Sequence, residues 1–234
     1  MVRPQRCRGS GWRVMPMKRR LIWLALFAIT MAYLESAVVV YLREIYYPAG
    51  FRFPIVIIMD WIAAVEIGRE VATVIMLLAV GALAGSDRWE RFLFFCLAFG
   101  VWDVFYYVWL WVFLRWPPSL MTWDVLFLIP VPWIGPVLAP LLVAMVVVIG
   151  SAALLRLKGR GAALRFSRYL WATAIAGGLV VILSFTIDFR VALEGAVPPP
   201  FRWGLFGVGL AIGLASLLLG IRSEKRLLRA AAPT

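Results

Sequence analysis

The stretch that decides the fold reads IAAVEIGREVATVIMLLAVGALA at residues 62–84, GSDRWER at 85–91 and FLFFCLAFGVWDVFYYVWLWVFL at 92–114. Each of the two apolar runs is long enough to cross a membrane, because about 20 residues at a rise of 1.5 Å span the hydrocarbon core. The polar linker between them is short, which makes the two runs antiparallel neighbours. The stretch therefore predicts a membrane-spanning helical hairpin.

The rest of the chain has the same apolar character. Of its 234 residues, 64% are hydrophobic and 15% are charged, and the mean hydropathy is +0.92, which lies outside the range of soluble domains. We predict an all-α membrane protein, a six-transmembrane helical bundle that forms a single domain over residues 21–221. The predicted spans are 21–42, 62–84, 92–114, 134–155, 169–187 and 203–221.

The basic residues predict the orientation of this bundle. Of the 24 Lys and Arg residues, 18 lie in the two tails and in the second and fourth linkers, whereas five lie in the other three linkers. By the positive-inside rule, both termini are expected in the cytoplasm and the protein in the plasma or inner membrane. Residues 1–20 and 222–234 are then basic cytoplasmic tails, and residues 1–14 are either an over-extended start or a disordered tail. Because topology accounts for the net charge of +12, nucleic-acid binding is not expected.

Prolines interrupt the outer linker between the third and fourth spans. Each proline removes a backbone donor and disfavours helix at the residue before it, so we expect no regular helix between Trp116 and Trp133. One interpretation is an interfacial or partly re-entrant cap on the outer side, and the other is a stiffened loop in the headgroups, with Trp116, Trp123 and Trp133 as interfacial residues. The prolines stand at positions 117, 118, 130, 132, 136 and 140.

Charged side chains lie inside the first three spans, where lipid strongly disfavours them. Counted from the predicted cytoplasmic ends, Glu35, Glu70 and Asp103 lie at heights of about 21, 21 and 17 Å in a core of about 30 Å. Glu66 and Arg69 lie within one turn of Glu70 on the same helix. Ionisable residues at membrane depth typically serve a substrate, ion or proton path, so this layer is the candidate functional site.

The third span adds two phenols to the layer. Asp103, Tyr106 and Tyr107 are spaced i, i+3 and i+4, so the acid and both tyrosines share one helix face. Arg69 is expected to neutralise its helical neighbours, but the acids outnumber it. Either some carboxyls carry a proton, or a bound cation, a water-filled vestibule or a partner balances their charge. A polar lock that only joins the three helices is the alternative to a functional site.

The residue types present limit the chemistry of this layer. The chain has no histidine, and its two cysteines are Cys7 in the basic tail and Cys96 in an apolar run. We therefore expect no haem and no metal bound by histidine or cysteine, and no cofactor is evident. A metal ion, if bound, is expected to be a hard cation held by Glu35, Glu70 and Asp103.

The remaining acids are expected to be solvated, with Asp124 in the outer cap as the one worth testing. They lie in linkers, tails or helix ends, at Glu44, Asp60, Asp87, Glu90, Asp124, Asp188, Glu194 and Glu224. Two GxxxG patterns, at residues 81–85 and 209–213, predict close helix packing within one chain.

Three functions fit these observations. The leading prediction is proton- or cation-linked transport of a small solute, because the acids are in excess. The second is a membrane-embedded enzyme that uses Glu or Asp for acid–base chemistry on a lipid or isoprenoid-like substrate. The third is an accessory subunit of a larger membrane complex, with another membrane protein or a second copy of the chain as its partner.

Overall fold

The computed structural model describes residues 15–48, 50–51, 53 and 61–230. Within these residues, six helices are long and apolar enough to cross a membrane. This confirms the prediction of a helical membrane bundle, and the chain is an integral membrane protein. The elements, in chain order, are α1 (Met17–Tyr46), α2 (Trp61–Ala84), α3 (Arg88–Leu114), β1 (Trp123–Phe127), β2 (Trp133–Pro136), α4 (Leu138–Gly159), α5 (Arg168–Thr186), α6 (Phe189–Leu193) and α7 (Trp203–Ala230).

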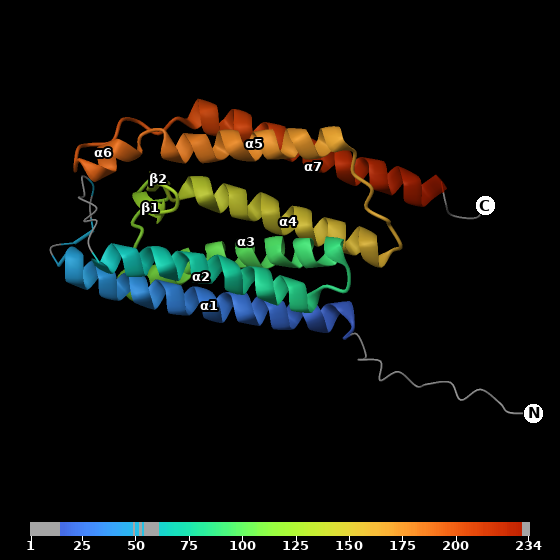
Figure 1. Ribbon diagram of the computed structural model, residues 1–234, viewed down its shortest axis with the longest axis horizontal. Helices are drawn as coiled ribbons and strands as arrows, with labels where there is room; N and C mark the ends of the chain where they lie inside the picture. The colour runs from blue at the N-terminus through green and yellow to red at the C-terminus, as the bar shows by residue number, and fades with distance from the viewer. Residues whose placement is uncertain (1–14, 49, 52, 54–60, 231–234) are drawn as a thin grey trace, which may run out of the picture.

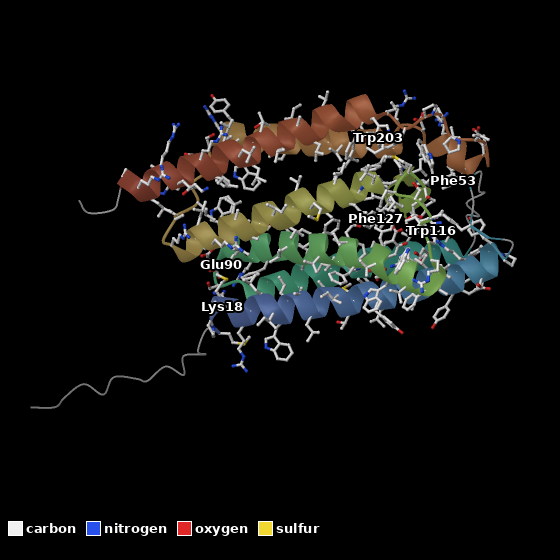
Figure 2. All side chains as sticks on the ribbon, turned by 180° about the vertical axis from the view of Figure 1, so that it is seen from behind. Lys18, Phe53, Glu90, Trp116, Phe127 and Trp203 are labelled. Atoms are coloured by element: carbon white, nitrogen blue, oxygen red, sulfur yellow. The ribbon has the colours of Figure 1, made fainter. Side chains whose placement is uncertain are left out.

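The long helices run roughly along one direction, with α4 between the group α1, α2 and α3 and the pair α5 and α7 (Figure 1). The two strands and α6 lie at one end of the bundle, which we call the hairpin end. The start of α1, the end of α7 and the turn between α2 and α3 lie at the other, which we call the basic end. In Figure 2, Trp116 and Phe127 lie towards the hairpin end, whereas Lys18 and Glu90 lie at the basic end.

Small side chains and two hydrogen bonds hold α1 against α3. Ala28 and Ala32 on α1 are fully buried, and so is Ala98 on α3, so the helices approach closely. The Trp109 indole donates to the backbone carbonyl of Ile29 at 3.1 Å, and the Ser36 hydroxyl donates to that of Tyr106 at 3.0 Å. These contacts fix the height of the third span relative to the first.

Glycines allow two further helix pairs to pack backbone to backbone. A Cβ at Gly81 would lie 2.7 Å from the backbone nitrogen of Phe95, so α2 and α3 could not approach so closely with any other residue there. A Cβ at Gly177 of α5 would lie 2.7 Å from the backbone nitrogen of Gly213 in α7. Both GxxxG patterns thus support packing within one chain.

A β-hairpin lies where the prolines interrupt the chain. Strands β1 and β2 are antiparallel, with Asp124 opposite Gly135 and Phe127 opposite Trp133. The all-α prediction missed this hairpin, although the absence of helix from 116 to 133 agrees with the described structure. Aromatic and β-branched residues favour strands here, and the prolines at 130 and 132 lie in the turn.

Several helix boundaries differ from the prediction, and three of them have a clear local cause. The first helix begins at Met17 rather than at 21, and the last continues to Ala230 rather than ending at 221. Lysine and arginine are good helix formers, so the basic flanks extend the apolar spans instead of forming tails. The fourth span begins at Leu138 rather than at 134, because residues 133–136 pair in β2.

The expectation that the remaining acids are solvated is wrong for Glu90, Glu224 and Asp124, which are 7%, 1% and 2% exposed. Glu90 accepts hydrogen bonds from the amide and hydroxyl of Ser86 at 2.9 and 2.5 Å and pairs with Arg20 at 2.7 Å. Glu224 accepts a hydrogen bond from a backbone amide in the linker between α4 and α5. Backbone and hydroxyl donors therefore satisfy Glu90 and Glu224, two acids that were expected to be hydrated. Asp60 lies outside the described residues.

Candidate functional site

The centre of the predicted layer is an ion-pair network between α1 and α2. Arg69 forms ion pairs with both Glu35 and Glu66, and its Nε donates to Glu66 at 2.8 Å. The Thr73 hydroxyl donates to Glu35 at 2.5 Å. Glu35 is 6% exposed. The structure thus brings these three predicted charged residues together, and the two acids share a single guanidinium.

Glu70 has a different partner. Both of its carboxylate oxygens accept from the backbone amide of Leu128, at 3.0 and 2.9 Å. Leu128 directly follows β1, so this hydrogen bond attaches α2 to the hairpin. The negative charge of Glu70 meets a neutral donor here rather than a cation.

A second ion pair joins α1 to the hairpin. Arg43 lies 3.4 Å from one oxygen of Asp124, and the Tyr107 hydroxyl donates to the other at 3.2 Å. The guanidinium carbon of Arg43 also lies 4.1 Å from the ring centre of Phe51 and 3.8 Å from that of Trp116. Cation–π contacts at these distances stabilise a desolvated guanidinium, so Arg43 is held on three sides.

Burial dominates the acidity of Asp124. Removal from water raises the pKa of this carboxyl to about 6, although the neighbouring Arg43 and the hydrogen bond from Tyr107 lower it. Asp124 thus changes its charge at a pH only slightly below neutral. The sequence had marked it as the acid of the outer cap worth testing.

Asp103 is the acid of the layer that stays unpaired. Its side chain makes no hydrogen bond or ion pair with any residue that the structure describes, and it is half-buried. Tyr106 lies one turn further along α3 with its ring 5.0 Å from that of Tyr107. Both tyrosines and Asp103 face one cavity, as their spacing predicted.

The three acids proposed as ligands of a hard cation do not form such a group. Among the described residues, no three His, Cys, Asp or Glu side chains are grouped closely enough to hold a metal ion. Glu35 is bound to Arg69, and Glu70 to a backbone amide. The cation site stays a prediction without support from this geometry.

The candidate site lies at one end of a cavity of about 640 Å³ that runs between α3 and α4 on one side and α5 and α7 on the other; α1, α2 and the hairpin line its charged end. One face of α3 lines it from Trp89 to Tyr107, a length of about 27 Å at 1.5 Å per residue. Phe92 and Trp171 also line it and are 43% and 38% exposed, so the cavity reaches the outside of the bundle between α3 and α5.

The two ends of this cavity differ in polarity. At the basic end it is lined by aromatic rings, among them Trp89 stacked on Trp171 with ring centres 5.6 Å apart, and Phe166 at 5.1 Å from Trp89. Apolar side chains of α4, α5 and α7 line its middle. The charged residues among the described lining all belong to the hairpin half, namely Glu35, Arg43, Glu66, Arg69, Glu70, Asp103 and Asp124.

The two tryptophans of the predicted outer cap are half-buried and pack against other aromatic rings. Trp133 stacks on Phe185 of α5 with ring centres 6.2 Å apart and also lines the cavity. Trp123 contacts Phe201 edge to face at 6.2 Å. The two rings therefore attach the hairpin to α5 and to the segment that leads into α7.

Sequence reasoning missed the role of Arg43, which it placed in an outer linker. Arg43 follows Glu35 by eight residues, and Val39 lies between them on the same face, so the helical period already indicated a shared side. Nothing in the spacing indicated that Asp124 would meet it, because that contact depends on the path of the hairpin.

Compared with protein-family models, curated proteins and solved structures, the chain has no match. The geometry of the site therefore carries the functional argument.

Proposed function

We propose that the protein binds a long-chain amphiphile, such as a lipid or an isoprenoid-like molecule, in the cavity between α3–α4 and α5–α7. The polar head lies among the charged residues of the hairpin end, and the chain follows α3 towards Trp89. The observation that carries this proposal is the polarity of the lining, which is charged in one half and apolar in the other.

Size and access also support an amphiphile. A volume of about 640 Å³ falls within the range of about 300–1,000 Å³ that is usual for small-molecule sites. The opening between α3 and α5 faces the acyl chains of the bilayer, so an amphiphile enters from the membrane without passing through water. The apolar chain then replaces lipid contacts along the aromatic and aliphatic lining.

The orientation of the site follows from the distribution of basic residues. With the basic end in the cytoplasm, as the positive-inside rule requires, the charged half of the cavity lies in the outer half of the plasma or inner membrane. The hairpin then covers the site on its outer side. The bound molecule has its head in the outer leaflet and its chain directed inwards.

A single substitution tests the proposal by filling the cavity. Gly178 of α5 lines the cavity, and a Cβ built on it meets no atom within 4 Å, so Gly178→Phe adds a ring without a backbone clash. Gly207 of α7 has the same open surroundings but lies outside the cavity lining, which makes Gly207→Phe the matched control. Each protein is purified in mild detergent, and its bound molecules are extracted, identified and quantified by mass spectrometry.

The wild type and Gly207→Phe are expected to retain a stoichiometric amphiphile, and Gly178→Phe to lose most of it. Equal retention by all three proteins contradicts the cavity as the binding site. A wild type that carries no bound amphiphile and takes up none from added lipid contradicts the function.

A second candidate is the cation- or proton-linked transport of a small solute. The unpaired carboxyl of Asp103 on the cavity wall favours it, because a relay needs a group that is free to exchange a proton. Proteoliposomes should then show pH-dependent flux that Asp103→Asn abolishes. Flux no higher than in protein-free liposomes removes this candidate.

A further inference from the structure

The charges that line the cavity restrict the head group of its ligand. Among the described lining residues, five acids face two arginines, and both arginines are already engaged. Arg69 is paired with Glu35 and Glu66, and Arg43 is paired with Asp124. Among the described lining residues, a phosphate or carboxylate head would find no unengaged cation and would meet more acids than arginines, which is strongly unfavourable away from water.

Several polar groups of the lining have no hydrogen-bond partner among the described residues, and three of them lie beside β1. Asp103 offers an acceptor to which no described residue donates. The indole nitrogens of Trp102 and Trp133 are buried donors without an acceptor, and Trp102 as a whole is only 6% exposed. Buried donors without partners are uncommon in folded proteins and costly, so they point to a group that is bound in the functional state.

These groups lie at the same end of the cavity. Trp102 and Asp103 are consecutive on α3, and the rings of Trp102 and Trp133 lie 6.3 and 5.7 Å from that of Phe127. Both indoles therefore flank one ring of β1 beside an acid. A ligand head at this place meets donors and an acceptor together.

We propose that the head group is uncharged and carries hydroxyl groups, which donate to Asp103 and accept from the indoles of Trp102 and Trp133. An ammonium could pair with Asp103 but has no acceptor for the two indole donors, and a fully ionised phosphate has no donor for Asp103. A hydroxyl both donates and accepts, so it can satisfy all three groups. The inference rests on the proposed amphiphile site and narrows its ligand to alcohols and polyols with a long apolar chain.

Matched probes with one chain and three heads test this inference. The full-length protein is stripped of bound lipid, and the binding of 1-monooleoylglycerol, oleylamine and oleyl phosphate is compared by native mass spectrometry. Monooleoylglycerol is expected to bind at least about tenfold more tightly than either charged probe. Asp103→Leu should lower the affinity for monooleoylglycerol about tenfold, as expected for a lost hydrogen bond to a charged group.

The control is Glu44→Leu, since Glu44 is an exposed acid of α1 outside the cavity lining, and it should leave the binding of all probes unchanged. Trp102→Phe is a second variant that keeps the aromatic packing and removes one donor, and it should weaken monooleoylglycerol binding severalfold. The head-group inference is overturned if oleylamine or oleyl phosphate binds as tightly as monooleoylglycerol, or if Asp103→Leu and Trp102→Phe both bind monooleoylglycerol with unchanged affinity. Either result leaves the amphiphile site standing. If no probe binds to the wild type, the proposed function itself fails.

Discussion

Buried acids lie at both ends of this bundle, but their surroundings differ. At the basic end, the turn between α2 and α3 satisfies Glu90 through Ser86, and Arg20 neutralises it. At the hairpin end, acids join separate elements and line the cavity, and Asp103 has no partner among the described residues. A buried charge is thus not by itself a sign of a site. What indicates a functional site is a cavity that reaches the charged group, together with a charged group that has no partner within the protein.

The largest effect is expected from removing the shared cation of the hairpin end. Arg69→Leu leaves Glu35 and Glu66 without a counter-charge, which should lower the free energy of unfolding by about 3 kcal/mol, as for other broken buried pairs. Titration with a denaturing detergent in mixed micelles measures the loss. Adding Glu35→Gln and Glu66→Gln to this variant should restore a large part of the stability, and no recovery would contradict the ion-pair network.

A smaller effect is expected from the titration of Asp124. Its pKa is raised to about 6 by burial, so the folded protein takes up a proton at a higher pH than the unfolded chain does. This carboxyl therefore makes the protein less stable as pH rises from about 4 to about 6, by a free energy on the order of 2 kcal/mol. The difference in stability between the wild type and Asp124→Asn, measured across this range, should show that slope. A flat difference would show that Arg43 cancels the effect of burial on the pKa of Asp124, and a slope of opposite sign would show that Arg43 outweighs it; either result would contradict the prediction.

The smallest effect is expected at the basic end. In Arg20→Gln, Glu90 keeps both of its bonds from Ser86 but loses its cation, and the bond from Arg20 to the Ala84 carbonyl is lost as well, so the loss should be about 1.5 kcal/mol, the low end for hydrogen bonds to a charged group. The same detergent titration checks this value, and the amphiphile content should stay that of the wild type. A loss as large as that of Arg69→Leu would remove the distinction between the two ends.

The sequence predicted the spans and part of the site because both depend on local spacing. Hydropathy identified six spans, and counting residues along helices placed Glu35 at the height of Glu70, with Glu66 and Arg69 within one turn of it. The hairpin was missed because its residues do not alternate between apolar and polar, as a strand with one solvated face would. The contact between Arg43 and Asp124 was missed because it depends on the path of a loop, which residue counting along a helix does not describe.

The cavity itself could not be predicted from the sequence. It results from how the pair α5 and α7 lies against α4 and the hairpin, with Gly177 setting the distance between α5 and α7. Hydropathy does not distinguish an apolar side chain that faces lipid from one that lines a cavity. Phe92 and Trp171, which do both, were read only as membrane-span residues.

The most direct test of the amphiphile site determines where each end of a bound molecule lies. The wild-type protein is loaded with 1-monooleoylglycerol that carries a photoreactive diazirine at the tip of its chain, irradiated, digested and sequenced by mass spectrometry. We predict labelling of the aromatic residues at the basic end, Trp89, Phe92 and Trp171. Trp89 and Phe92 lie about 21 and 16.5 Å along α3 from Asp103, and Trp171 stacks on Trp89. Labelling confined to the hairpin end, or spread over the outer faces of the helices, would contradict the binding of an amphiphile along this cavity.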